Sequence, residues 1–349
     1  QSKHKTTFSL ALIAVFGIVP SVSAVVRTDA RIEYLTDFAS YSVWTPDYDV
    51  DQYQYGDPEV TSEIIGYQRD YSVLDSQNNP TVTSFTGTVI SYANYSSLST
   101  HAQTTVVNPV PLGSNQPYKD EAGNLIEGGM PSGFSSNSSA SMYDSIQMSL
   151  PNIANIKFKL GLNGAISGID GVDQGPQSGA FQIYMQATQS NGEIVRSQIS
   201  HDYYGGVFDF SDWTLRYPTK FFDKEYFSSL IPTVNGTAQF SFELNTEAAT
   251  VFSAMTSSGP GFFASEGETY EVTSDLTLSI LGIYAYDGNG NLLNSSLLSA
   301  GINELKGKSG ASYSLLAAPV PDPESYVLML SGLGFLGSMM RRRQASLAE

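Results

Sequence analysis

Apolar residues occupy every second position in five separate stretches of the chain. Successive side chains of a β-strand point to opposite faces, so this alternation is typical of strands that bury one face. The stretches cover residues 142–150, 156–163, 181–187, 240–244 and 276–286. In the last stretch the odd positions also become apolar from Leu281 onward, which predicts a central strand covered on both faces.

Few segments have a pattern that predicts a structure other than a strand. Residues 219–230 and 246–255 could each form a short helix, but neither carries a long amphipathic stripe. The sequence DGNGN at residues 287–291 predicts a hairpin turn that leads into a strand over residues 292–298. Strand-length segments separated by turn residues predict an all-β fold, with a β-sandwich or jelly-roll-like ectodomain over residues 25–317.

One part of the ectodomain has two interpretations. Residues 108–133 are rich in Pro, Gly and Asn, and residues 135–141 are rich in Ser. Such composition is typical of a linker or a long loop. The region 108–140 is therefore either an internal domain boundary or a surface loop within one sandwich.

Charge and cysteine content exclude several classes of protein. The chain has 17 Lys and Arg against 34 Asp and Glu, a formal net charge of −17, so it lacks the basic surface that nucleic acid requires. The absence of cysteine excludes disulfides, thiol catalysis, iron–sulfur clusters and Cys-based zinc sites.

Residues 1–24 have the features of a secretory signal peptide. Lys3 and Lys5 make a basic start, residues 8–19 form an apolar run, and small residues follow at positions 23 and 24. These features predict cleavage between Ala24 and Val25 and export of the mature chain. The alternative is a membrane anchor, for which the apolar run is short.

A second apolar run lies at the other end of the chain. A linker over residues 318–325 precedes an apolar segment at 326–340 and a basic tail at 341–349 that begins with Arg341, Arg342 and Arg343. Fifteen helical residues span roughly 22 Å, less than the ~30 Å of a bilayer core, so this is a short transmembrane helix. The arginines predict that the C-terminus stays in the cytoplasm and the ectodomain lies outside.

The linker, the Gly-interrupted span and the Arg cluster together closely resemble the C-terminal sorting signal of PEP-CTERM proteins. Pro321-Asp322-Pro323 stands where that family usually has Pro-Glu-Pro. The resemblance implies an exosortase-type processing enzyme as partner, an inner-membrane-anchored precursor, and delivery to the cell surface or extracellular matrix of a Gram-negative bacterium. Residues 138–310 also resemble the β-rich ectodomains of such proteins. The alternative is a plain C-terminal membrane anchor.

No catalytic motif emerges from the sequence. The mature chain keeps His101 and His201, and the neighbour Asp202 would point to the opposite face of a strand from His201. Acidic pairs such as those at 170 and 173 or 266 and 268 are the kind of groups that a glycosidase uses, but in a chain this acidic they are not informative. We therefore expect a protein that is not an enzyme.

Acidic residues at alternate positions suggest calcium, because hard oxygen ligands at this spacing let a loop wrap a cation. The candidate ligands are Asp47, Asp49, Asp51, Asp57 and Glu59. The alternative is an acidic surface loop. The turn with Asp287, Asn289 and Asn291 has the same spacing and is a weaker candidate, against a plain hairpin turn. No other cofactor is expected.

Aromatic residues within acidic stretches suggest a polysaccharide partner, because flat amphipathic rings beside carboxylates and amides are typical of sugar-binding faces. The alternative is packing within the sandwich. The residues concerned are Tyr41, Trp44, Tyr48, Tyr53, Tyr55, Tyr203, Tyr204 and Trp213.

Together the features of the sequence predict a structural or adhesive protein of the cell envelope or matrix. The alternative is a surface glycoside hydrolase or lyase on a jelly-roll fold.

Overall fold

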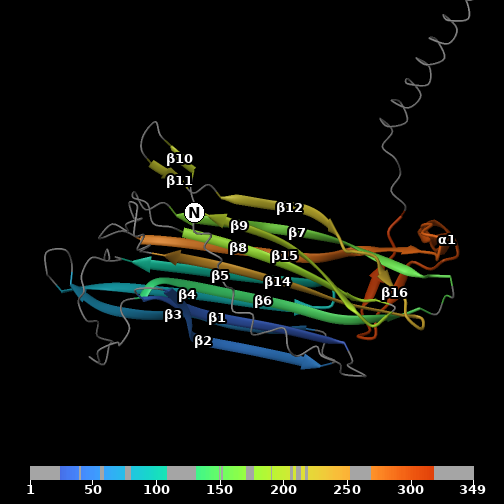
Figure 1. The fold of residues 1–349 in the computed structure, drawn as a ribbon, viewed down its shortest axis with the longest axis horizontal. Coiled ribbons are helices and arrows are strands. Elements are labelled where there is room, and N and C mark those ends of the chain that lie inside the picture. The colour runs from blue at the N-terminus through green and yellow to red at the C-terminus, as the bar shows by residue number, and fades with distance from the viewer. Residues whose placement is uncertain are drawn as a thin grey trace, which may run out of the picture.

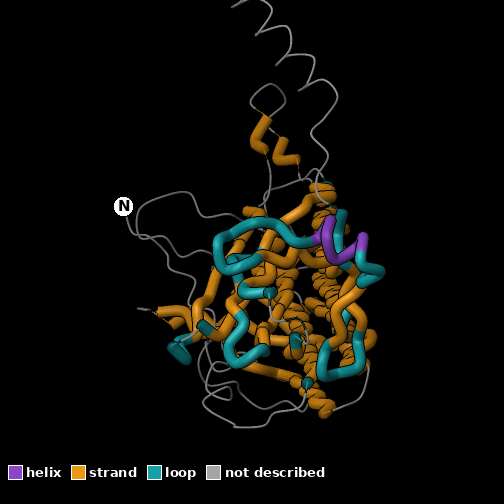
Figure 2. Tube along the Cα trace, turned by 90° about the vertical axis from the view of Figure 1, so that its right-hand side faces the viewer, coloured by secondary structure: helices purple, strands orange, loops and turns teal. Residues whose placement is uncertain are grey.

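The structure is a computed structural model in which two antiparallel sheets lie face to face (Figure 1). It describes residues 24–38, 41–55, 59–74, 80–107, 131–148, 150, 152–169, 177–189, 191–204, 207–209, 214–216, 219–251 and 269–317. Figure 2 looks along the strands and shows the two layers in cross-section. The prediction of an all-β protein is confirmed for this part of the chain.

The two sheets have six and seven strands. The six-stranded sheet has the order β2 (Tyr41–Tyr55), β1 (Val25–Phe38), β6 (Pro131–Gln147), β14 (Thr237–Val251), β8 (Gln177–Thr188), β9 (Ile194–Tyr204). The seven-stranded sheet has the order β12 (Lys220–Phe227), β7 (Asn155–Ile169), β15 (Thr269–Tyr286), β5 (Ser97–Val107), β4 (Pro80–Asn94), β3 (Glu59–Leu74), with β13 (Ile231–Pro232) also paired to β7. Two small hairpins complete the strands: β10 (Val207–Asp209) with β11 (Thr214–Arg216), and β16 (Glu304–Lys306) with β17 (Ser312–Ser314).

The alternating stretches of the sequence lie on strands whose apolar side chains meet between the sheets, except that the first stretch continues beyond the end of β6 at Gln147. Phe158 on β7 contacts Phe240 on β14 with ring centroids 4.4 Å apart, and both side chains are buried. A smaller apolar cluster contains Phe85 and Phe134, whose rings stack with centroids 4.2 Å apart. The core of a sandwich is therefore built from the residues that the alternation predicts.

A seam of hydroxyl groups joins the two layers where apolar side chains are absent. The Ser136 Oγ donates a hydrogen bond of 2.7 Å to the Gln103 carbonyl oxygen, and the Thr104 Oγ1 donates one of 2.7 Å to the Ala248 carbonyl oxygen. Both bonds cross from one sheet to the other. Small polar side chains thus let the backbones approach closely while every cited hydroxyl keeps a partner.

Strands from both sides of the region 108–140 share both sheets. β1 pairs with β6, and β5 pairs with β15, so residues before and after this region form one pair of layers. The Ser-rich run 135–141 lies inside β6, in the interior of the six-stranded sheet, and is not a loop. Residues 108–130 lie outside the described part of the chain.

Four local predictions are wrong. Residues 219–230 and 246–255 contain β12 and the end of β14 in place of short helices. The strand predicted over 292–298 reduces to a single bridge between Tyr286 and Leu292, after which the helix α1 (Asn294–Ser299) begins. In β15 the apolar residues change from even to odd positions because the register shifts between Ile280 and Gly282, so a β-bulge accounts for the change.

The residues after α1 form a closing segment at one end of the sandwich, which we call the C-terminal clasp (residues 304–316). The Leu316 N–H donates a 3.0 Å hydrogen bond to the Ile283 carbonyl oxygen of the seven-stranded sheet. The Lys308 N–H donates a 2.7 Å bond to the Ser145 carbonyl oxygen of the six-stranded sheet. The clasp therefore ties both layers together immediately before residue 318.

No described helix is long and apolar enough to cross a bilayer.

Candidate functional site: a polar face on the six-stranded sheet

The residues proposed from the sequence as calcium ligands do not share one loop. Asp47, Asp49 and Asp51 lie on β2, which is extended and pairs with β1, so the predicted loop is a strand. Glu59 begins β3 and accepts a 2.7 Å hydrogen bond from the Tyr92 hydroxyl. Residue 57 and the side chains at 47, 49 and 51 lie outside the described part, so calcium binding stays a prediction.

The turn at 287–291 is closed by its own side chain. The Asp287 Oδ1 accepts hydrogen bonds from the backbone N–H groups of Asn289 (2.9 Å) and Asn291 (2.8 Å), and its Oδ2 accepts one from the Asn291 amide (2.9 Å). These bonds lower the pKa of Asp287 below its usual value, the Asn291 amide most of all. The carboxylate is thus occupied in stabilising a turn, which is the alternative that the sequence left open.

The two histidines lie far apart in the topology. His101 is on β5 of the seven-stranded sheet, with its Nδ1 3.9 Å from the Asp275 Oδ2, and His201 is on β9 of the other sheet. The acidic pairs at 170 and 173 and at 266 and 268 lie outside the described ranges, as do residues 321–323 and 341–343. Ala24 and Val25 are buried at the start of β1, and signal cleavage between them stays a prediction.

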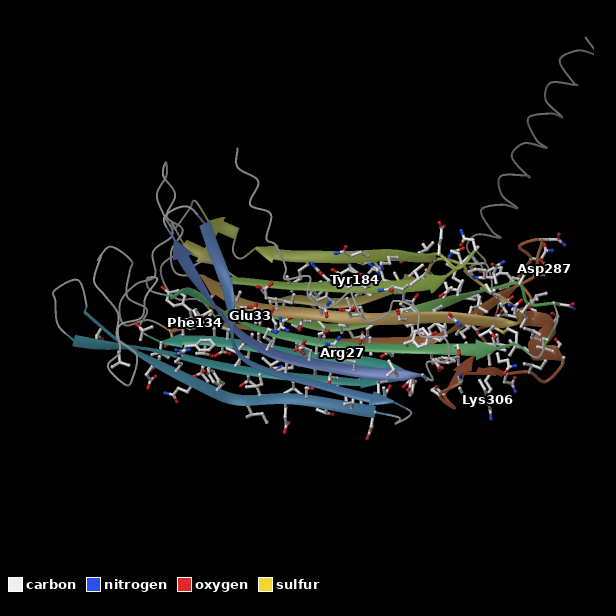
Figure 3. The ribbon with its side chains drawn as sticks, turned by 60° about the horizontal axis from the view of Figure 1, so that its bottom comes forward. Arg27, Glu33, Phe134, Tyr184, Asp287 and Lys306 are labelled. Atoms are coloured by element: carbon white, nitrogen blue, oxygen red, sulfur yellow. The ribbon has the colours of Figure 1, made fainter. Side chains whose placement is uncertain are left out.

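A continuous layer of polar side chains lies on the outer side of the six-stranded sheet, and sequence reasoning missed it. Most of its members are half-buried, and Arg27 and Asp29 are buried, at 5% and 7% exposed. We call it the polar face and define it by the outward residues of four neighbouring strands in the order β1, β6, β14, β8. The strand pairing places these residues opposite one another, in three rows that run across the four strands. The rows are Arg27–Ser141–Glu243–Tyr184, Asp29–Ser139–Asn245–Gln182 and Arg31–Asn137–Glu247–Ala180. Figure 3 labels Arg27 and Glu33 on β1 and Tyr184 on β8, with β6 and β14 between them.

Charged side chains on β1 form a chain of contacts along the polar face. The Arg31 guanidinium lies 3.4 Å from the Asp29 Oδ2 and 3.6 Å from the Glu33 Oε1. The Asn137 amide donates to the Glu33 Oε2 at 3.2 Å and to the Ser135 Oγ at 3.1 Å. The bond between Asn137 and Glu33 crosses from β6 to β1, so it joins the ion pairs of β1 to the polar side chains of β6.

The same network continues to β14. The Ser135 Oγ donates a 3.3 Å hydrogen bond to the Glu247 Oε1, and the Asn245 amide donates a 2.8 Å bond to the Glu243 Oε1. The Asn245 Oδ1 is buried and accepts no hydrogen bond from the described residues. On β6 itself the side chains are short, so a row of Ser and Asn lies between two rows of longer charged or amide side chains.

Glu243 is a carboxylate of the polar face whose pKa is shifted by its surroundings. Burial raises its pKa above the ordinary value, and this effect outweighs the Asn245 hydrogen bond and the attraction of Arg27 and Arg196, which act in the opposite direction. A desolvated carboxylate beside amides and a tyrosine ring is a typical component of a binding or catalytic site. Across the described ranges, no three acidic or histidine side chains gather closely enough to hold a metal ion.

Replacing Glu243 with Gln is expected to stabilise the protein at neutral pH. Because the folded-state pKa is raised, burying the carboxylate costs stability above that pKa, and the cost disappears as the pH falls below the unfolded value near 4.5. We expect Glu243→Gln to raise the Tm by roughly 2–4 °C at pH 7 and to have little effect at about pH 3. Thermal unfolding at both pH values measures this.

The control for this prediction is Glu271→Gln. Glu271 lies on β15 of the other sheet, where the Gln103 amide donates to its Oε1 at 3.0 Å. A gain at pH 7 that is equal in the two variants, or that persists unchanged at low pH, would contradict the assignment to Glu243.

One signal in the sequence does mark part of the polar face. Arg27, Asp29, Arg31 and Glu33 occupy alternate positions, with opposite charges in succession. On a strand this spacing places all four on one side and predicts the ion pairs observed. The contributions of β6, β14 and β8 depend on long-range pairing and have no local signal.

The chain matches no protein-family model and no curated protein sequence. The class of the protein therefore rests on its fold and on the polar face: an antiparallel, sandwich-like β protein with an extended polar surface.

Proposed function

We propose that this chain is an exported protein of the cell envelope or extracellular matrix of a Gram-negative bacterium, with a structural or adhesive role and an association with polysaccharide. The polar face is the observation that carries the association. Its rows of Ser, Asn, Gln, Tyr, Arg and Glu offer the donors and acceptors that sugar hydroxyls require.

Export and sorting belong to the same proposal and rest on the two ends of the sequence. A signal peptide ending at Ala24 and a PEP-CTERM-like tail with Pro321, Asp322 and Pro323 would deliver the ectodomain through an exosortase-type enzyme. The C-terminal clasp supports this arrangement, because it fastens the last described residues to both sheets shortly before Pro321.

A carbohydrate-active enzyme is the second candidate, and one observation favours it. The raised pKa of Glu243 is the property that a general acid needs in glycoside hydrolysis. This enzyme would use the same polar face as the adhesive protein.

Incubation of the chain, as recovered from its expression host, with a panel of insoluble and soluble polysaccharides distinguishes the two functions. For the adhesive role we expect retention on at least one polysaccharide without release of new reducing ends, and loss of retention in a variant of the half-buried Tyr184, Tyr184→Ala. Release of reducing ends that Glu243→Gln abolishes would establish the enzyme instead. Retention unaffected by Tyr184→Ala and Glu243→Gln would remove the polar face from the proposal.

A further inference from the structure

The two sheets end in four edge strands: β2 and β9 in the six-stranded sheet, and β3 and β12 in the seven-stranded sheet. An edge strand presents unpaired N–H and C=O groups, so it is a template for pairing with another chain. Proteins that must avoid such pairing place prolines, bulges or charged residues on their edges.

Three of the four edges carry these features. β2 contains Pro46 and a register shift opposite Ile32 and Glu33. β3 has a register shift between Ile64 and Tyr67, with Gly66 at a φ of 61°. β12 has eight residues, four of them charged. Each of these edges is therefore irregular or charged.

The β9 edge has neither a proline nor a bulge, and only two of its eleven residues, Arg196 and Asp202, are acidic or basic. Its eleven residues pair with β8 in unbroken register from Ile194 to Tyr204, and they include neither Pro nor Gly. Ile194 and Val195 are 45% and 40% exposed. Among the described elements, β8 is the one that packs extensively against β9. A long, regular edge with exposed β-branched residues is a predicted pairing site.

We propose that β9 pairs antiparallel with β9 of a second copy of this chain, across a two-fold axis, so that the six-stranded sheets of both copies form one continuous sheet. The sequence of β9 supports this occupant because it is self-complementary. In the register centred on Ile199, Arg196 lies opposite Asp202 of the second copy, and the pairing occurs twice by symmetry. Moving the centre by one residue loses both opposite-charge pairs.

The dimer extends the polar face. Gln198 pairs with Tyr184 in the first row of that face, so the rows of one copy would lead directly across β9 into the rows of the other. A repeating polymer could then contact two equivalent surfaces held in one plane, which strengthens binding through multivalency. The dimer itself does not depend on polysaccharide binding.

Charge reversal tests the pairing. The chain as recovered from its expression host is expected to have the mass of two copies by light scattering after size exclusion. Arg196→Glu would place like charges opposite each other and weaken the dimer at least tenfold, and the double variant Arg196→Glu/Asp202→Arg would restore it. Lys224→Glu on β12 is the matched control and should leave the dimer intact. A native monomer, or a dimer indifferent to Arg196→Glu, overturns the proposal.

Cysteine cross-linking tests the register independently, because the chain contains no cysteine of its own. Ile199→Cys lies at the two-fold axis and should form an intermolecular disulfide under mild oxidation. Ile194→Cys is the control, since the two copies of residue 194 would be roughly 34 Å apart. A cross-link through residue 194 and none through residue 199 would overturn the register.

Discussion

Replacing Asp144 with Ala is expected to lower the free energy of unfolding by roughly 3–5 kcal/mol. Asp144 is fully buried at the end of β6 and is the point at which the C-terminal clasp meets the six-stranded sheet. Its Oδ2 accepts hydrogen bonds from the Ser309 hydroxyl (2.5 Å) and the Tyr313 hydroxyl (2.8 Å). Its Oδ1 accepts from the backbone N–H groups of Ser309 (3.1 Å) and Ser145 (2.7 Å).

The large effect follows from what the substitution leaves behind. Without the carboxylate, the buried Tyr313 hydroxyl loses its acceptor, which costs about 1–3 kcal/mol, and the half-buried Ser309 donors lose theirs as well. Tyr313 is held as a donor because burial, followed by the charge and the hydrogen bond of Asp144, raises its pKa. The backbone of the clasp packs directly against this carboxylate, since a Cβ at Gly307 would overlap the Asp144 Oδ2 and lie 2.9 Å from the Tyr313 ring.

Urea unfolding of Asp144→Ala, Asp144→Asn and Tyr313→Phe measures the contribution of this group. We expect Asp144→Asn and Tyr313→Phe to cost less than Asp144→Ala, and to be non-additive in a double-mutant cycle because they share one bond. Asp275→Ala is the control, because that side chain is 66% exposed and should change stability by less than about 0.5 kcal/mol. An Asp144→Ala variant as stable as Asp275→Ala would refute the role of the clasp.

The strands were predictable from sequence and several local features were not, for identifiable reasons. Alternation over 181–187 locates β8 because one face meets an apolar core and the other meets solvent. The same rule fails for residues 135–141, because Ser136 and Ser138 face the other sheet and bond to its carbonyl oxygens, so buried positions look polar. Buried Ser residues whose hydroxyl groups form hydrogen bonds stand where apolar residues would otherwise be, so the alternation of apolar and polar residues is absent from this part of the sequence.

Local geometry accounts for the other differences. A single inserted residue at Leu281 inverts the alternation of β15, and sequence alone reads this as burial on both sides. The helix α1 did have a signal that the strand prediction overlooked, since Leu293 and Leu297 are four residues apart and Gly301 follows with a φ of 81°. Asn294 adds a tertiary reason, because its buried amide bonds to Ala285, Ile283 and Leu316.

The polar face was predictable from the sequence only in part. Its β1 residues follow a charge alternation that is visible in the sequence, whereas Glu243 and Ser141 become neighbours of Arg27 only through strand pairing between segments far apart in the chain. The raised pKa of Glu243 is likewise a property of its burial and not of its local sequence. A site distributed over four strands requires the sheet order, which no local pattern contains.

Replacing Gly164 with Ala is expected to be the most damaging single-methyl change in the described part of the chain. Gly164 lies on β7 with a φ of 139°, and a Cβ there would overlap the Asp275 carbonyl oxygen and lie 2.9 Å from the Leu276 Cα. Both are backbone atoms of β15, the neighbouring strand, so no side-chain rotation can relieve the clash. We expect a loss of more than about 4 kcal/mol, seen as a chain that is insoluble or unfolded at about 25 °C.

Two other glycines separate the steric cost from the backbone cost. Gly66 has a φ of 61°, and a Cβ added there would have no neighbour within 4 Å, so Gly66→Ala should cost only about 1 kcal/mol from its left-handed backbone. Gly288 has open space and no positive φ, so Gly288→Ala should leave the Tm within about 2 °C of the parent chain. If Gly164→Ala had the same Tm as Gly66→Ala, the close approach of β7 and β15 would be wrong. The pairing at the centre of the seven-stranded sheet would then be wrong as well.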